Sequence, residues 1–395
     1  MAERTSRRRV KTPSGQALET TPRGSSLVSD PVAQKPVLSP RQLIWRRFLR
    51  HRLGVIGSVV VIAMTIVTIF AGFLSPYAPG QFHQQLGFAP PTPIHFVRDG
   101  QLVGPFVYGT TRTFNPNTGE AIFQRTDDVY PIKFLVRGDA YRFLGLVETN
   151  LHLFGTGEPP RSNGQLFLFG ADKFGRDLFS RTLIGGRVSL FIGPLALLVI
   201  IPLAAFFGGI SGFFGGRADM LIQRIIELLQ SYPQLPLLLV LATILPPDLS
   251  QEARFIGIIL ILSITSWTGI ARVLRGQILA YREEEYVLAA RGMGASNNRI
   301  IFRHLLPNTL SYLIVVATLT IPGLILAEAG LSFLGLGINE PATSWGLLLQ
   351  SANNVSSLTS HPWLLVPGFF IIVSVLAFNF MGDALRDATD PKSAS

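Results

Sequence analysis

The segment from Glu285 to Asn308, EYVLAARGMGASNNRIIFRHLLPN, has the residue types of a docking surface. Acidic residues before Tyr286 can open a helix, two closely spaced glycines can end it, and Ser296 can cap a second helix. Small side chains on an exposed helix face let another protein approach closely, whereas an exposed ion pair contributes only about 0–1 kcal/mol. We therefore expect packing to dominate a contact made by Glu285, Ala289, Ala290, Arg291, Gly294, Ala295, Arg299, Arg303, His304, Leu306 and Pro307.

Patterns of catalysis and metal binding are missing from the sequence. No lysine follows a glycine, so the nucleotide-binding loop G-x-x-x-x-G-K-[ST] is absent, and this polypeptide is not expected to hydrolyse ATP. The sequence has no H-E-x-x-H, G-x-S-x-G or EF-hand pattern. Without cysteine it has no thiolate nucleophile or thiolate metal site. We expect no catalytic residue, no metal site and no cofactor in this chain.

One acidic residue, Glu328, lies within an apolar run, in LILAEAGLSFLGLG. Ionisable residues inside membrane spans are costly and are commonly functional. Glu328 therefore either faces a translocation path or forms hydrogen bonds within the helix bundle, where nearby glycines interrupt the span. In another apolar run, SYPQLPLLLVL, Pro233 and Pro236 should kink the helix by removing hydrogen bonds. Such a kink can serve a gate or only packing.

Long apolar runs must position these residues. The mean hydropathy is +0.39, and the chain is 48% hydrophobic but only 15% charged, which is typical of an integral membrane protein. A helix needs roughly 20 apolar residues to cross the hydrocarbon core. Residues 53–74 meet this requirement without a charge, and the basic region before them is too long for a cleaved signal peptide. Further spans are expected at about 189–210, 222–245, 255–273, 310–334 and 363–382, which gives an all-α polytopic membrane protein with both termini on one side.

Basic residues set the expected orientation. Arginines are concentrated before the first span, between the second and third spans, and after the fourth, and such loops are normally cytoplasmic. The formal net charge of +10 is therefore better explained by orientation in a bilayer than by binding to nucleic acid. Both termini and the docking segment, within the loop 282–308, are expected in the cytoplasm.

Several segments lie outside the predicted spans. Residues 1–40 are polar and predict a disordered cytoplasmic tail, and residues 41–52 predict either an interfacial amphipathic helix or a simple basic flank. Residues 75–165 are too many for a loop and predict a small, mixed β-rich insertion on the outer side. A hairpin is expected within 106–126 and another strand from Tyr130.

Two acidic and two basic residues precede the second span at helical spacing. Asp172 with Arg176, and Asp177 with Arg181, are four residues apart. This spacing predicts two salt bridges on a helix that leads into the span. The alternative is a contact surface for a soluble partner.

The docking segment resembles the cytoplasmic signature of the inner-membrane permeases of ABC importers. Leu288 and His304 depart from that signature, as in its dipeptide and oligopeptide branch. GADKFGRDLFSR, AEAGLSFLGLG and MGDALRDATDP are also similar to the second permease of that branch, and the resemblance covers about 39–75 and 165–391. The signature, E-A-A, three residues, Gly, nine residues and I-x-L-P, maps onto Ala289, Ala290, Gly294, Leu306 and Pro307.

The resemblance implies the type I ABC importer permease fold, with six transmembrane helices in the cytoplasmic (inner) membrane. Its parts would be a flank and first span (41–74), the insertion (75–165) and a permease core (166–391) whose loop 282–308 couples to an ATPase. The implied partners are membrane lipid, a second permease, two cytoplasmic ATPases that bind ATP and Mg, and an extracytoplasmic solute-binding protein that delivers peptide. Within the branch, nickel chelates, oligosaccharides or modified peptides are alternative solutes. A secondary transporter or a membrane-anchored scaffold would be an alternative of another class.

Overall fold

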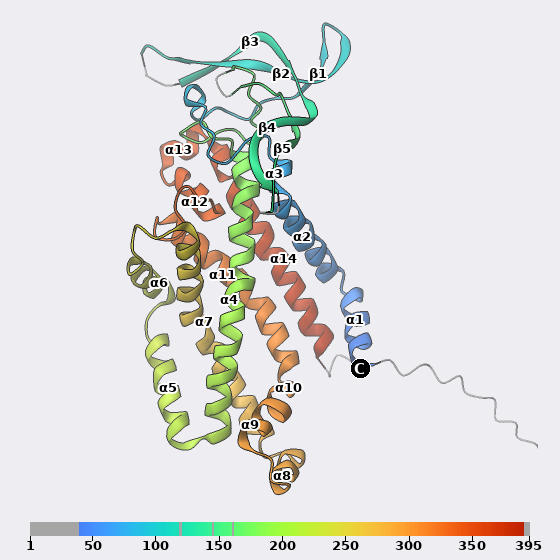
Figure 1. Ribbon diagram of the computed structural model, residues 1–395, viewed down its shortest axis with the longest axis vertical. Coiled ribbons are helices and arrows are strands. Elements are labelled where there is room, and N and C mark those ends of the chain that lie inside the picture. The colour runs from blue at the N-terminus through green and yellow to red at the C-terminus, as the bar shows by residue number, and fades with distance from the viewer. Residues whose placement is uncertain (1–38, 118–120, 144–145, 160–161, 391–395) are drawn as a thin grey trace, which may run out of the picture.

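The computed structural model describes residues 39–117, 121–143, 146–159 and 162–390. It is an elongated helical bundle with a group of β-strands at one end (Figure 1). Apart from Ser39 and Pro40, the expected disordered tail, 1–40, lies outside the described residues. The helices are α1 (Pro40–Arg50), α2 (Arg52–Ile69), α3 (Ala71–Leu74), α4 (Leu178–Phe214), α5 (Gly216–Gln230), α6 (Gln234–Thr243), α7 (Gln251–Tyr281), α8 (Glu285–Gly292), α9 (Asn297–Ile300), α10 (Leu306–Asn308), α11 (Leu310–Phe333), α12 (Trp345–Leu349), α13 (Val355–Ser360) and α14 (Val366–Thr389).

Most of the expected spans are present as helices of sufficient length. Within the described residues, α2, α4, α7, α11 and a segment that ends with α14 are long and apolar enough to cross a membrane. The expected span at 222–245 is instead divided into α5 and α6, which meet at an angle of 88°. Proline has no backbone N–H, and Pro233 lies at this break as the N-cap of α6. The described residues therefore contain five candidate spans, or six if the bent pair counts as one.

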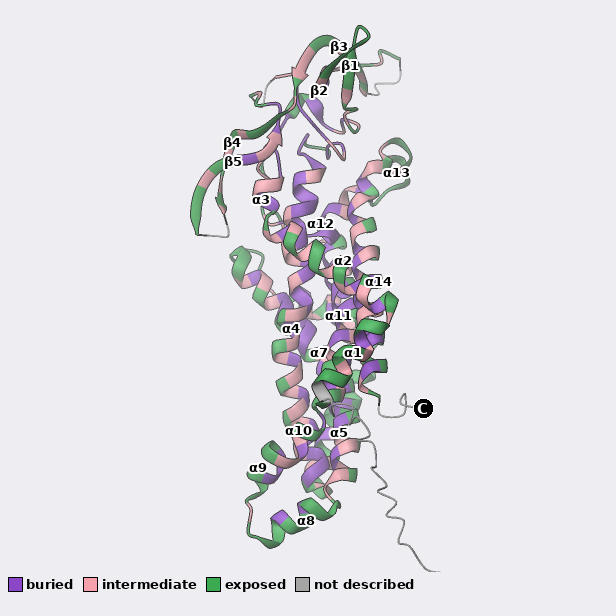
Figure 2. Cartoon of the chain, turned by 90° about the vertical axis from the view of Figure 1, so that its right-hand side faces the viewer, coloured by how far each residue is buried: buried purple, intermediate pink, exposed green. Residues whose placement is uncertain are grey.

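The bundle core lies between α4, α7 and α11. Its buried residues include Ile192, Ile200, Ile258, Leu262 and Leu324, and the buried positions run through the middle of the bundle (Figure 2). On another side, α2 packs closely on α14. A Cβ atom added at Gly54 would lie 2.0 Å from the Cβ atom of Ala384, so the glycine permits a backbone approach typical of membrane helices.

The helix α1 extends the bundle beyond α2. Ser39 and Gln42 form a capping box that starts α1. Phe48 is buried against Ala384 and Ala388 of α14, whereas Trp45 is 62% exposed. The basic stretch therefore forms a helix with one face packed on the bundle.

The predicted β-rich insertion is present between α3 and α4. Its strands form an antiparallel sheet β1-β2-β3 and a separate hairpin β4-β5. Phe114 pairs with Ala121 and Thr110 with Arg125, which confirms the hairpin expected within 106–126. The strand expected from Tyr130 begins later, because Tyr130 still belongs to β3. The strands are β1 (His95–Arg98), β2 (Gln101–Phe114), β3 (Ala121–Pro131), β4 (Lys133–Phe143) and β5 (Val147–Gly155).

Candidate functional site

The docking segment forms two short helical parts joined by a tight turn, at the end of the bundle opposite the strands (Figure 1). α8 ends at Gly292, and Gly294 has a φ of +80°, a conformation that favours glycine. The Ala295 N–H donates to the Ala290 carbonyl oxygen over 3.0 Å, which closes the helix end. The Ser296 hydroxyl oxygen accepts from the Arg299 N–H and caps α9. After α9 the chain forms a π-helix, Ile301–Leu305.

One face of this segment packs on the bundle and the other faces outward. Val287, Ile300 and Leu305 are buried against Phe213 and Ile278, while Met293 and Phe302 are 82% and 61% exposed. Figure 2 shows α8 and α9 as largely exposed. Of the predicted docking residues, Glu285, Ala289, Arg291, Gly294, Arg299, Arg303 and Pro307 are exposed, Ala295, His304 and Leu306 are half-buried, and Ala290 is buried.

The burial of Ala290 corrects one expectation. The sequence suggested that Ala289 and Ala290 share an exposed face, but Ala290 is only 4% exposed. Adjacent residues on a helix point about 100° apart, so Ala290 turns toward the bundle when Ala289 faces outward. Arg291 also makes a contact that the sequence did not indicate, because its guanidinium carbon lies 5.4 Å from the centre of the Phe213 ring.

Arginines next to the docking segment tie the end of α7 to α4 and α5. The Arg282 guanidinium, just before α8, donates to the carbonyl oxygens of Gly212 and Phe213 over 3.3 and 3.4 Å. In α7, the Arg275 guanidinium makes a bidentate ion pair with the Asp219 carboxylate of α5, with N–O distances of 2.5 and 2.6 Å. The last turns of α7, which lead into the docking segment, are therefore connected to the start of α5.

The far end of α5 borders a cavity of about 430 Å³. Its walls come from the bend between α5 and α6, from α7 and from α11. The Gln230 side-chain amide donates to the Thr268 hydroxyl oxygen over 3.1 Å across this site. The sequence indicated only the proline kink, although the polar residues around Pro233 were a usable signal. The lining residues are Leu229, Gln230, Tyr232, Gln234, Leu237, Thr265, Ser266, Thr268, Gly269, Leu319, Thr320, Gly323 and Leu324.

Glu328 is fully buried and is not among the residues that line this cavity. Its carboxylate accepts hydrogen bonds from the hydroxyls of Ser332 and Ser189, over 2.7 and 3.3 Å. The Ser189 hydroxyl oxygen in turn accepts from the backbone N–H of Trp345, and the Ser332 hydroxyl oxygen accepts from the backbone N–H of Ile338. Glu328 thus connects α4, α11 and the start of α12. This supports the interpretation that Glu328 forms hydrogen bonds within the helix bundle.

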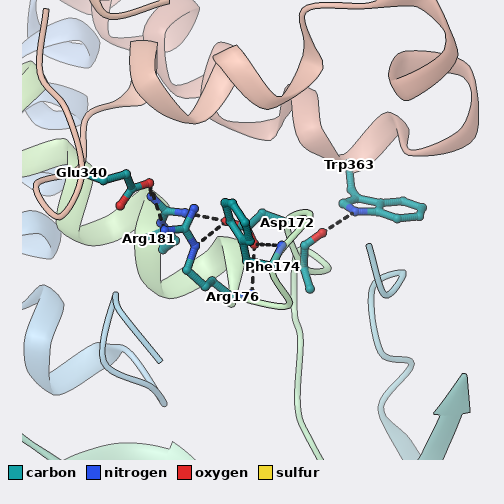
Figure 3. Close-up of polar contacts among 7 residues, drawn as sticks. Asp172, Phe174, Arg176, Arg181, Glu340 and Trp363 are labelled. Carbon is teal, nitrogen blue, oxygen red and sulfur yellow. Dashed lines mark hydrogen bonds and ion pairs between the residues drawn. The ribbon is translucent and has the colours of Figure 1, made fainter. Parts of the chain in front are cut away.

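A charged network lies at the N-terminal end of α4 (Figure 3). The Asp172 carboxylate pairs with Arg176 over 2.7 Å and with Arg181 over 2.5 Å. Both arginines also reach Glu340, in the segment between α11 and α12, over 3.0 and 2.5 Å. Both arginine side chains are under 8% exposed, so this network joins two distant parts of the chain in a largely buried setting.

Only one of the two predicted salt bridges is confirmed. Asp172 pairs with Arg176, although in the turn before α4 rather than on a helix. The expected pair of Asp177 with Arg181 is wrong, because Arg181 turns to Asp172 and Glu340. Asp177 instead caps α4 by accepting from the Ser180 and Phe179 N–H groups. Burial raises the pKa of Asp177 to about 7, although the hydrogen bonds from Ser180 act in the opposite direction.

Within the described part of the chain, no group of three or more His, Cys, Asp or Glu residues could hold a metal ion.

Comparison with known proteins gives consistent matches. The model of the family "binding-protein-dependent transport system inner membrane component" matches residues 200–395, and that of the "N-terminal TM domain of oligopeptide transport permease C" matches residues 39–91. The dipeptide transport system permease protein DppC of Bacillus subtilis is 45% identical over 225 residues, which is 57% of this chain and 68% of the relative. The oligopeptide transport system permease protein OppC of Haemophilus influenzae is 42% identical over 234 residues, 59% of this chain and 72% of the relative.

A longer match extends through the β-rich insertion. The dipeptide transport system permease protein DppC of Lactococcus lactis is 32% identical over 366 residues, which covers 91% of this chain and 93% of the relative. A match of this extent cannot leave out residues 75–165.

Proposed function

The chain belongs to the family of binding-protein-dependent transport system inner membrane components, and we propose that it is the second permease subunit of an ATP-driven importer of dipeptides or oligopeptides. Relatives that are named as dipeptide and oligopeptide permeases support the solute class. The proposed assembly contains this chain, a second permease, two cytoplasmic ATPases that bind ATP and Mg, and an extracytoplasmic solute-binding protein. The bent pair α5–α6 would count as one of six spans of the type I permease fold.

The orientation of the chain in the inner membrane is proposed from its basic residues. Arg46 and Arg50 lie in α1, Arg217 in the first turn of α5, Arg299 in α9 and Arg386 in the last turn of α14. These parts of the helices point away from the strands (Figure 1). Basic residues at one end of the spans favour a cytoplasmic location for that end. Both termini and the docking segment would then be cytoplasmic, and the strands would lie outside.

The observation that carries the coupling role is the outward face of the docking segment. Ala289, Met293 and Gly294 are exposed there, while the opposite face is fixed on Phe213 and Ile278. Small and apolar residues that are exposed on a helix packed from behind suit a groove on another protein better than they suit water. Because the sequence contains no nucleotide-binding loop, an ATPase is the partner that can supply energy at this surface.

Purification of the chain with its neighbours from its own membranes tests this proposal. We expect two ATPase subunits and a second permease to co-purify, and we expect the assembly to hydrolyse ATP. The isolated chain should show no hydrolysis. ATP hydrolysis by the isolated polypeptide, or its purification as a single chain under conditions that preserve related assemblies, would contradict the proposal.

A further inference from the structure

The bend between α5 and α6 is an unsuitable surface for lipid. The helical structure is interrupted at Ser231–Pro233, and each residue from Gln230 to Pro236 is exposed in this chain. In the hydrocarbon core, broken backbone is tolerated only where protein covers it or where it lines a water-filled cavity. This bend lies within a pair of helices that together are apolar enough to span a membrane, so water or another subunit must cover it.

The polar side chains that line the cavity beside the bend are all uncharged. Its polar groups are the side-chain amides of Gln230 and Gln234 and the hydroxyls of Tyr232, Thr265, Ser266, Thr268 and Thr320. No lining residue in the described part of the chain is Asp, Glu, Lys, Arg or His. The nearby charges on α5, Arg224 and Glu227, pair with each other over 2.9 Å.

Amides and hydroxyls both donate and accept hydrogen bonds, as the peptide backbone does. A fixed charge in a medium of low dielectric constant would attract solutes of opposite charge and repel those of like charge much more strongly than in water. A conducting path must also release what it binds. The volume of about 430 Å³ lies within the usual range for small-molecule sites, roughly 300–1,000 Å³.

We propose that the residues lining this cavity form part of the wall of the solute path. Their neutral hydrogen-bonding groups bind the peptide backbone and do not select among side-chain charges. This proposal rests on the proposed function and adds to it the residues in contact with the solute. Gln230 is central, because it reaches across the cavity to Thr268 and also ends α5, the helix that Asp219 and Arg275 tie to α7 near the docking segment.

The test uses the complete transporter, with its solute-binding protein, in proteoliposomes. Initial uptake rates are measured for Ala-Lys-Ala, Ala-Gln-Ala and Ala-Glu-Ala, each at a concentration that saturates the solute-binding protein. In Gln230→Glu, we expect the ratio of the lysine-peptide rate to the glutamate-peptide rate to change at least about tenfold relative to the wild type. Gln251→Glu makes the same chemical change at an exposed position outside this cavity and should leave the ratio unchanged.

Thr320→Glu, on the α11 side of the cavity, should shift the same ratio, and it serves as the test if Gln230→Glu does not assemble. Thr268→Val should lower the rates of all three peptides by a similar factor, because it removes a hydroxyl without adding charge. An unchanged ratio in assembled Gln230→Glu or Thr320→Glu, with normal peptide uptake by the wild type, would overturn the inference alone. If the wild-type assembly takes up no peptide, the proposed function itself is wrong.

Discussion

Gly294 is the residue on which the shape of the docking segment depends most directly. Its φ of +80° places it in the left-handed region, which costs other residues roughly 1–2 kcal/mol. No atom lies within 4 Å of a Cβ added there, so backbone strain alone would oppose a side chain. We expect Gly294→Val to weaken binding of the purified ATPase to the permease about tenfold.

Gly294→Asn is the matched control, because asparagine enters the left-handed region more readily than valine. Binding of the ATPase to detergent-purified permease can be measured for both variants. Equal, unchanged binding in both would mean that the turn does not position the docking surface.

Asp177 provides a pH-dependent contribution to stability at the residue scale. It lies just before the spanning helix α4, and burial raises its pKa to about 7, above the ordinary value of about 3.9 in the unfolded chain. The stability gained from its neutral form is therefore full below about pH 4 and is lost as the pH rises through about 7.

Asp177→Asn should remove this part of the pH dependence while retaining an N-cap acceptor, since Asn caps helices about as well as Asp. Thermal unfolding of the detergent-solubilised chain between pH 4 and 8 measures the difference. The wild-type midpoint should fall relative to that of the variant as the pH rises. Parallel curves would contradict the assignment.

The helix cap and the turn of the docking segment could be predicted from the sequence, but the exposure of its residues could not. Ser296 and Gly294 occupy the cap and turn positions that their chemistry indicates. The burial of Ala290 depends on which face of α8 turns to the bundle, and this is the face whose Val287 clusters with Phe213, a residue far earlier in the chain. Likewise, Arg181 prefers Glu340, 159 residues away, over Asp177 at helical spacing, because tertiary contacts outweigh a local pairing rule.

At the scale of elements, the charged network should stabilise the N-terminal end of α4 far more than a surface pair would. The Asp172 side chain is 2% exposed and is shared by two buried arginines. Arg224, paired with Glu227, is 75% exposed. Removing one member of a buried ion pair costs about 3–5 kcal/mol, whereas an exposed pair is worth about 0–1 kcal/mol.

We therefore expect Asp172→Asn to lower the free energy of unfolding by several kcal/mol and Arg224→Ala to change it by less than about 1 kcal/mol. Chemical unfolding in detergent, followed by tryptophan fluorescence, gives both values. Similar small effects in both variants would show that the network is not a main support of this end of the bundle.

The spans could be predicted from hydropathy, but the angle of 88° between α5 and α6 could not. Pro233 predicts an interruption because it lacks an N–H group. Proline alone does not fix the result: Pro194 and Pro202 lie inside α4, which continues for 37 residues. One difference is that α4 keeps a buried face on both sides of its prolines, with Ile192, Ile200 and Ala204 in the bundle core, whereas every residue from Gln230 to Pro236 is exposed.

At the scale of the whole molecule, the proposed orientation places the strands and the docking segment on opposite sides of the membrane. The chain has no cysteine, so one engineered cysteine gives a unique label. In intact cells whose outer face is accessible, a membrane-impermeant maleimide should label Asn117→Cys. It should label Met293→Cys only after the membrane is opened. The reverse pattern would contradict the orientation.

The insertion shows where sequence reasoning at this scale stops. Its hairpin could be predicted from the turn residues and the Phe-containing runs on either side of them, but its attachment to the bundle could not. His152 of β5 contacts the carbonyl oxygens of Ser75 and Asp139 over 2.5 and 2.9 Å, which ties the β4-β5 hairpin to the end of α3. The contact with Ser75 joins residues 77 positions apart, and no local pattern marks it.

Peptide uptake driven by ATP tests the central claim most directly. The complete assembly, reconstituted in proteoliposomes with the solute-binding protein outside and ATP inside, should accumulate a labelled dipeptide or oligopeptide against its gradient. Accumulation should stop when ATP is replaced by a non-hydrolysable analogue or when this chain is omitted. Uptake that proceeds without ATP under an ion gradient, or a fully assembled complex that hydrolyses ATP but moves no peptide, would contradict the account.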